Sequence, residues 1–248
     1  MDTQACLVYM RQHQTDMIAA LEALVNHESP STDKAYLDAL AGTLKTRWEA
    51  LGAEVTVIPQ IGCGDHLRIT LPGATPASAG RPPALILGHF DTVWPVGTLR
   101  RKPFLVREGR ATGPGVYDMK GGLVIAEFAL RAIMDLGLTL PRPVVLLLNS
   151  DEETGSATSR SHIEDAASGA AYTLVLEPAV PGGALKTARK GVGGFTLAVQ
   201  GRASHAGSAP LEGVSAVEEL ARQILRLHGF TDHDLGTTVN VGDRKSVV

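Results

Sequence analysis

The sequence predicts an α/β protein whose central sheet is mostly parallel. Two short, continuous apolar runs, at 84–87 and 144–148, are typical of strands that are buried on both faces, and a further buried strand is predicted at 173–176. Segments with helical spacing lie between the strands along the first two thirds of the chain. This alternation favours a layered fold in which helices cover a parallel sheet.

The elements of the first part follow from local patterns. The spacing predicts a helix that ends at Gly52 and has Ser31 or Thr32 as N-cap, with one apolar face made of Leu37, Leu40, Leu44, Trp48 and Leu51. Strands are expected at 54–58 and 67–71, followed by a loop at 72–83 that is rich in proline and glycine. A second helix is predicted over 122–136, because its apolar residues recur with helical spacing and Gly137 follows.

The pattern changes near residue 187, where we place a domain boundary. Residues 195–200 alternate between apolar and polar side chains, which predicts a strand with one wet face. A helix at 214–228 and a strand at 237–241 are expected to follow. The second domain is therefore predicted to be of the α+β type.

Bulk composition favours an ordinary cytoplasmic protein. The 248 residues are 44% hydrophobic and carry a formal net charge of -3, with no basic stripe for nucleic acid and no apolar run for a membrane. Residues 1–11 lack the features of a secretion signal. The two cysteines, Cys6 and Cys63, have no metal-type spacing, as is typical of a reducing compartment.

Four polar clusters follow predicted strands or open a helix. His89 can offer an imidazole to a metal, and Asp91, two residues on, can hold its other ring nitrogen. Asp118 stands in a glycine-rich segment just before a helix, where it reads either as an N-cap or as a carboxylate that bridges two cations. Taken singly, a surface histidine or a capping aspartate would explain each of these two clusters.

The other two clusters are acidic. Asp151, Glu152 and Glu153 follow one strand directly, where three acids repel one another unless they serve a site or form a solvated turn. Glu177 follows the next strand. Ligands of open α/β sheets bind beyond the carboxyl ends of the strands, so one histidine and several carboxylates there predict a site for zinc or a hard cation.

These motifs, in this order, resemble the dizinc peptidases related to glutamate carboxypeptidase. That family also includes aminoacylases, acetylornithine deacetylase and succinyl-diaminopimelate desuccinylase. The segment from Phe90 to Pro95 is most similar to the glutamate carboxypeptidase branch. The resemblance implies that residues 1–186 form part of a zinc-exopeptidase catalytic domain and residues 187–242 the first part of a lid and dimerisation domain, both incomplete.

The resemblance also implies roles for single residues. His89 and Glu153 would be terminal ligands on different zinc ions, Asp118 would bridge the two ions, and Glu177 would complete the first. Asp91 would orient His89, and Glu152 would be the general base. Cobalt or manganese can replace zinc in such sites.

Two further assignments follow from the resemblance. His205, in the segment Gly201–Gly207, would reach across a homodimer to stabilise the oxyanion, and Asn240 would help to hold a substrate carboxylate. Lys120 is expected to be structural. The remaining histidines, His66 among them, are expected at the surface or at caps.

The chain departs from the family pattern towards its end. Relatives return to the first domain after the lid and supply a final histidine to the second zinc, and no such residue follows Glu177 here. Residues 243–248 are what read-through into a common sequencing adapter would encode, so our hypothesis is that this tail is an artefact of a truncated sequence. We expect poor solubility and little hydrolysis if the chain is made as written.

The motifs leave the substrate open. The leading hypothesis is hydrolysis of a peptide or amide bond next to a free carboxylate. The alternatives are removal of an acyl group from an N-acyl amino acid, and an inactive fragment that only binds metal or dimerises. An intact Glu152 argues against the last of these, since a pure binding module needs no base.

Overall fold

The computed structural model describes residues 3–180 and 182–242. The chain divides into two compact units, Met1–Lys186 and Thr187–Val248, and each is considered by itself. The tail at 243–248 lies outside the described residues. No helix in the described part of the chain is long and apolar enough to span a membrane.

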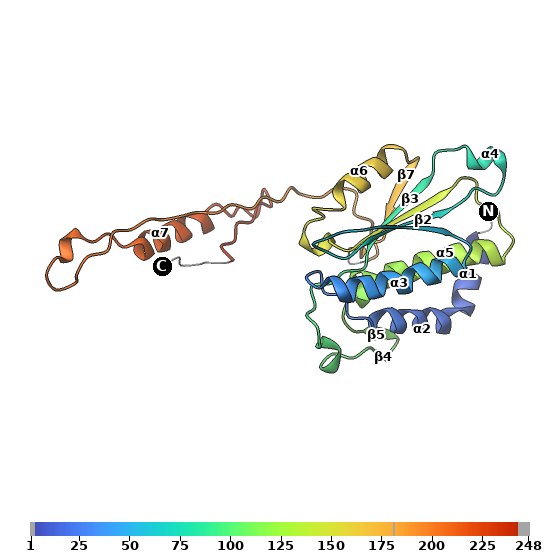
Figure 1. Cartoon of the computed structure of the whole chain (residues 1–248), viewed down its shortest axis with the longest axis horizontal. Helices are drawn as coiled ribbons and strands as arrows, with labels where there is room; N and C mark the ends of the chain where they lie inside the picture. Colours follow the sequence, from blue (N-terminus) through green and yellow to red (C-terminus); the bar gives the residue numbers. More distant parts are fainter. Residues whose placement is uncertain (1–2, 181, 243–248) are drawn as a thin grey trace. The chain divides into compact units, whose positions relative to one another are not determined.

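The first unit is built on a five-stranded sheet with the order β1-β2-β6-β3-β7 (Figure 1). The strands are β1 (Glu54–Ile58), β2 (His66–Leu71), β3 (Ala84–His89), β6 (Val144–Asn149) and β7 (Tyr172–Val175). β3 pairs in parallel with both β6 and β7, whereas β2 is antiparallel to both of its neighbours. Four of the five strands therefore point the same way, and the predicted α/β class with a mostly parallel sheet is confirmed.

Helices cover both faces of this sheet (Figure 1). The larger core lies between one face and the apolar sides of the helices on it, with Trp48 and Leu146 fully buried. On the other face, a smaller cluster places Ile163 of α6 against Leu85 and Leu147. The helices are α1 (Thr3–Gln12), α2 (Gln14–Val25), α3 (Lys34–Ala50), α4 (Pro76–Ala79), α5 (Gly121–Asp135) and α6 (Arg160–Ser168).

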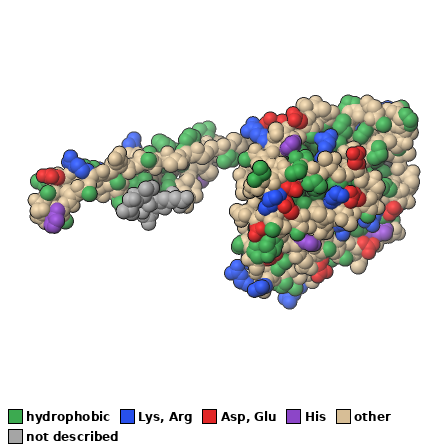
Figure 2. All heavy atoms as spheres, viewed as in Figure 1, with side chains coloured by type: hydrophobic (Ala, Val, Ile, Leu, Met, Phe, Trp, Pro, Cys, Tyr) green, Lys and Arg blue, Asp and Glu red, His purple; other side chains and the backbone are tan. Residues whose placement is uncertain are grey.

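The remaining elements of this unit are short. They are the 3-10 turns η1 (Thr98–Arg100) and η3 (Glu152–Thr154), the π-helical turn η2 (Val116–Lys120), and the hairpin of β4 (Leu105–Arg107) and β5 (Arg110–Thr112). The face visible in Figure 2 carries charges of both signs in a scattered pattern.

Several local predictions in the first unit were wrong, and the loop expected at 72–83 contains the short helix α4. The N-cap of α3 is Asp33, whose carboxylate accepts from the amide of Ala35, and neither Ser31 nor Thr32 caps it. The strand at 173–176 was expected to be buried, but β7 is exposed along its length. It lies at the edge of the sheet and has a neighbour on one side only, so its apolar side chains are half open.

The second unit contains η4 (Pro210–Glu212) and α7 (Ala216–His228), which begins at the cap Ser215. The predicted strands at 195–200 and 237–241 were wrong, since neither segment forms a strand in the described residues. A strand needs a neighbour to pair its backbone groups. Here Phe195 is 99% exposed and Thr237 makes only an isolated bridge to Asp232.

Candidate metal centre

The sheet brings three polar segments to one edge. β3 ends at His89, which lies opposite Asn149, the last residue of the parallel strand β6. β7 pairs with β3 up to Val175, so Glu177 follows two residues beyond the end of that strand. Because these strands are parallel, the residues that follow them converge at the same edge.

Asp118 reaches this edge from η2, immediately before α5. The turn begins at Gly115, which has a φ of 69° and whose added Cβ would lie 2.7 Å from a methyl carbon of Thr92. A Cβ on Gly122 would lie 2.4 Å from the carbonyl oxygen of Leu176. Both glycines therefore allow the backbone of the Asp118 segment to pack close to the ends of β3 and β7.

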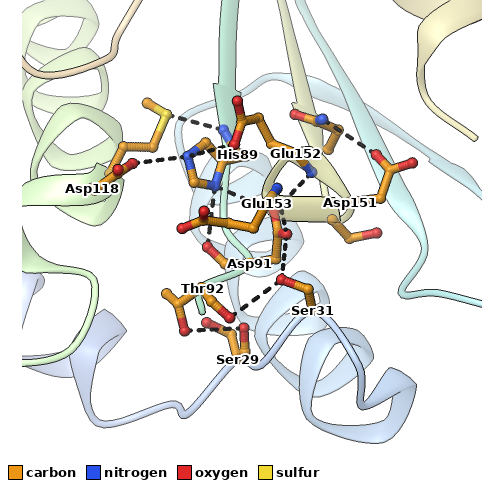
Figure 3. Close-up of polar contacts among 12 residues, drawn as sticks. Ser29, Ser31, His89, Asp91, Thr92, Asp118, Asp151, Glu152 and Glu153 are labelled. Carbon is orange, nitrogen blue, oxygen red and sulfur yellow. Dashed lines mark hydrogen bonds and ion pairs between the residues drawn. The ribbon is translucent and has the colours of Figure 1, made fainter. Parts of the chain in front are cut away.

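His89 is the centre of the cluster (Figure 3). Its side chain is buried, and Nε2 lies 3.1 Å from Asp118 Oδ1, 3.4 Å from Glu177 Oε1 and 3.9 Å from Glu152 Oε2. Two overlapping sets of potential ligands result, His89 with Glu152 and Glu177, and His89 with Asp118 and Glu153. In each set the donor atoms lie within 4.8 Å of one another.

Asp91 holds the opposite side of the imidazole. His89 Nδ1 lies 3.2 Å from Asp91 Oδ1 and 3.1 Å from the backbone oxygen of the same residue. Its carboxylate, which is fully buried, also accepts from the hydroxyl of Ser31 and from the backbone amides of Glu152 and Glu153. A donor at Nδ1 leaves Nε2 as the ring atom that can bind a cation.

The charges in the cluster fit a bound cation. Burial alone would lower the pKa of His89, but hydrogen bonds to Asp91 and Glu177 and the charges of these acids raise it to about 11. Burial and neighbouring carboxylates raise the pKa of both Glu152 and Glu153. The site thus holds excess negative charge that attracts a proton, and a divalent cation would supply the missing positive charge.

The donor types also fit. One imidazole nitrogen and several carboxylate oxygens suit zinc and harder divalent ions, and no thiolate belongs to either set. His89, Asp118, Glu152, Glu153 and Glu177, which the motifs singled out, are therefore brought together in space.

His205 and Asn240 lie in the second unit, and both are exposed. His205 Nδ1 accepts from the backbone amides of Gly207 and Ser208, which stabilises its own loop. Their expected contributions to oxyanion and carboxylate binding remain predictions. Lys120 lies outside the cluster: its buried ammonium donates to the carbonyl oxygens of Leu24 and His27, and burial lowers its pKa to about 7.

Sequence reasoning missed several residues behind the site. Ser31 read as a helix cap, but its hydroxyl donates to Asp91 Oδ2 over 2.7 Å, across 60 residues of sequence. His66, expected at the surface, is fully buried beside Ser150 and Thr158. For both Ser31 and His66, the sequence shows a polar residue next to a predicted strand or helix. That position does not tell which distant residue the side chain will bond to.

Comparisons with known proteins agree with this geometry. The pattern of the peptidase family M20/M25/M40 matches residues 85–239, which include the whole cluster. Carboxypeptidase G2 of Pseudomonas sp. (strain RS-16) is 33% identical over 222 residues, which are 88% of this chain and 52% of that protein. Acetylornithine deacetylase of Proteus mirabilis is 28% identical over 230 residues, 91% of this chain and 54% of that protein.

Solved structures share the fold. Aminopeptidase PepT from Bacillus cereus has a TM-score of 0.60 at 23% identity and matches 86% of this chain and 57% of its own. Human carnosine dipeptidase 1 has a TM-score of 0.58 at 22% identity and matches 69% of this chain and 40% of its own. The chain spans about half the length of the curated relatives it matches. By its family pattern, which covers well over half of its residues, this chain belongs to peptidase family M20/M25/M40.

Proposed function

We propose that this chain carries the metal-binding and proton-transfer residues of a dizinc hydrolase that cleaves a peptide or amide bond next to a free carboxylate. The observation that carries the proposal is the pair of overlapping ligand sets around His89. Similarity to carboxypeptidase G2 supports a carboxypeptidase-like reaction. A cytoplasmic location and a homodimer formed through the second unit belong to the same proposal.

The ligand assignment follows the family resemblance, and the short distances among these side chains support it. His89, Asp118 and Glu177 would hold one ion, and Asp118 and Glu153 would hold the other, with Asp118 as the shared bridge. When bound, two such cations polarise the scissile carbonyl and make an attacking water more acidic. Asp91 holds the ring of His89 so that Nε2 faces the carboxylates of Asp118 and Glu177, where it could bind a cation.

Glu152 would move the proton. Its carboxylate is partly exposed, its Oε2 lies 3.9 Å from His89 Nε2, and its raised pKa favours proton uptake. A base at this position takes a proton from the attacking water and then delivers it to the leaving amine. The two successive glutamates would thus have different roles, with Glu153 as a metal ligand and Glu152 as the general base.

Deacylation of an N-acyl amino acid is the second candidate, which the similarity to acetylornithine deacetylase favours. Both reactions break a C–N amide bond and need the same ions and base. The two candidates differ in the substrate. In the first, the free carboxylate belongs to a residue of a peptide, and in the second it belongs to the amino acid from which the acyl group is removed.

The test measures metal content and hydrolysis separately. The purified chain should bind zinc, His89→Ala should lose it, and Glu152→Gln should keep the metal but lose any hydrolysis of dipeptides or N-acetyl amino acids. Glu49→Gln, at an exposed ion pair on α3, is the matched control. Zinc binding that survives His89→Ala, or measurable hydrolysis that is equal in the unaltered chain and in Glu152→Gln, would overturn the assignment.

A further inference from the structure

A second polar cluster, buried except for the exposed residue Thr158, lies behind residues 151–155, which we call the acidic loop. Its members are Cys63 from the segment before β2, His66 at the start of β2, Asp151 from the acidic loop and Thr158 just before α6. The carboxylate of Asp151 lies on the far side of this loop from His89 (Figure 3). This cluster shares no residue with the two ligand sets around His89.

The hydrogen bonds in the cluster form a chain in which each group donates to the next, from the amide of Ser150 to the carboxylate of Asp151. The backbone amide of Ser150 donates to His66 Nδ1 over 3.2 Å, so the ring carries its proton on Nε2. That proton is donated to the hydroxyl oxygen of Thr158 over 3.0 Å, and Thr158 in turn donates to Asp151 Oδ2 over 2.8 Å. Burial lowers the pKa of His66, in keeping with a neutral ring.

The same cluster has the composition of a metal site, but a hydroxyl fills its middle. The donor atoms of Cys63, His66 and Asp151 lie within 4.8 Å of one another. The hydroxyl oxygen of Thr158 lies 3.1 Å from the sulfur, 3.0 Å from the ring nitrogen and 2.8 Å from the carboxylate oxygen. It occupies the place a cation would take and satisfies all three groups.

This network fixes the backbone from which the two glutamates project. Besides the Thr158 hydroxyl, Asp151 Oδ2 accepts from the amides of Thr158 and Ser159, and the backbone oxygen of Asp151 accepts from the amide of Ser156. From the other side, the amides of Glu152 and Glu153 donate to Asp91. The acidic loop is thus held between two buried carboxylates, one behind it and one inside the site.

We propose that His66 and Thr158 are positioning residues that hold Asp151 and thereby place Glu153 for metal binding and Glu152 for proton transfer. The inference rests on the proposed function, since it needs Glu153 to be a ligand. It predicts that the Thr158 hydroxyl influences zinc affinity although it touches none of the proposed ligands. Loss of a residue that hydrogen-bonds directly to a ligand weakens metal sites by about 10–100-fold. Thr158 acts through Asp151, so its effect should lie at the lower end of this range.

The test compares three threonine variants in the complete chain. Thr158→Val keeps the shape of the side chain but removes the hydroxyl, Thr158→Ser restores the hydroxyl, and Thr46→Val removes a hydroxyl that only bonds within α3. Zinc affinity is measured by competition with a chelator. We expect Thr158→Val to bind about tenfold more weakly, and the other two variants to bind like the unaltered chain.

Several outcomes would overturn the inference. Equal zinc affinity in Thr158→Val and Thr46→Val would do so while leaving the proposed function intact. A sulfur-to-cobalt absorption band after cobalt loading, lost in Cys63→Ser, would show that the cluster is itself a metal site. If the unaltered chain binds no zinc, the proposed function fails and this inference fails with it. Should Thr158→Val not fold, His66→Gln, which removes the donor to Thr158, carries the same comparison.

Discussion

Replacing Asp91 with asparagine tests a side chain whose carboxylate accepts hydrogen bonds from four donors in the site. Its buried carboxylate accepts at Oδ1 from His89 and the amide of Glu152, and at Oδ2 from Ser31 and the amide of Glu153. Asparagine keeps one oxygen and replaces the other with an amino group, which is a donor. Two of the four donors would then face a donor.

The least costly arrangement places the new amino group at the Oδ2 position. The hydroxyl of Ser31 can rotate to accept from it, but the amide of Glu153 cannot and loses its partner. An unpaired buried amide costs about 1–3 kcal/mol. Loss of the negative charge weakens the remaining bonds by roughly 1 kcal/mol more. We therefore expect the free energy of unfolding to fall by about 2–4 kcal/mol, the sum of these two terms.

The assay is urea unfolding of the metal-free chain, followed by the fluorescence of its two tryptophans, Trp48 and Trp94, together with zinc competition. Ser31→Ala removes one hydroxyl, which donates to Asp91 Oδ2 and, over a longer distance, to the backbone oxygen of Thr92, and should cost only about 1 kcal/mol. Zinc affinity should fall by about 10–100-fold in Asp91→Asn, because His89 loses its charged partner. Unchanged stability and unchanged zinc affinity in Asp91→Asn would refute the reasoning.

Three further predictions concern the core and the pH dependence. Glu127→Gln should destabilise the chain by about 1–3 kcal/mol in urea unfolding, since buried Glu127 accepts two hydrogen bonds from Arg47; the exposed control Glu49→Gln should change little, and equal losses would contradict this. Trp48→Ala should cost about 3–5 kcal/mol by circular dichroism, because this side chain is 1% exposed, and a loss below 1 kcal/mol would show that the cavity collapses. His66 should make stability fall as the pH drops below about 6.5, since the unfolded chain then protonates His66 while burial keeps the folded ring neutral. The raised pKa values of Glu152 and Glu153 act in the opposite direction, so the unaltered chain is compared with His66→Gln, which should lose less stability in acid; an identical pH dependence would exclude this cause.

The sequence was most informative where a signal is local. The apolar runs at 84–87 and 144–148 became β3 and β6, and the helix expected over 122–136 became α5 at Gly121–Asp135. Each of these elements contributes side chains to the core, and that packing enforces its pattern of apolar residues. The strands expected at 195–200 and 237–241 failed because alternation of side chains cannot supply the neighbouring strand that a ladder requires.

Some features of the candidate site could likewise be predicted from local sequence, and others could not. The sequence alone gives the types and the order of the candidate ligands His89, Asp118, Glu153 and Glu177. It also places each of them after a strand or before a helix, because hydrophobic runs and glycines mark those elements. That was enough to predict a metal-binding edge and the family. Only the tertiary structure decided what supports that edge: the partners of Asp91 include Ser31, 60 residues away, and Thr158 joins His66 to Asp151 across 92 residues. Such partners are chosen by strand register and packing, since a buried carboxylate must find its donors wherever the fold brings them.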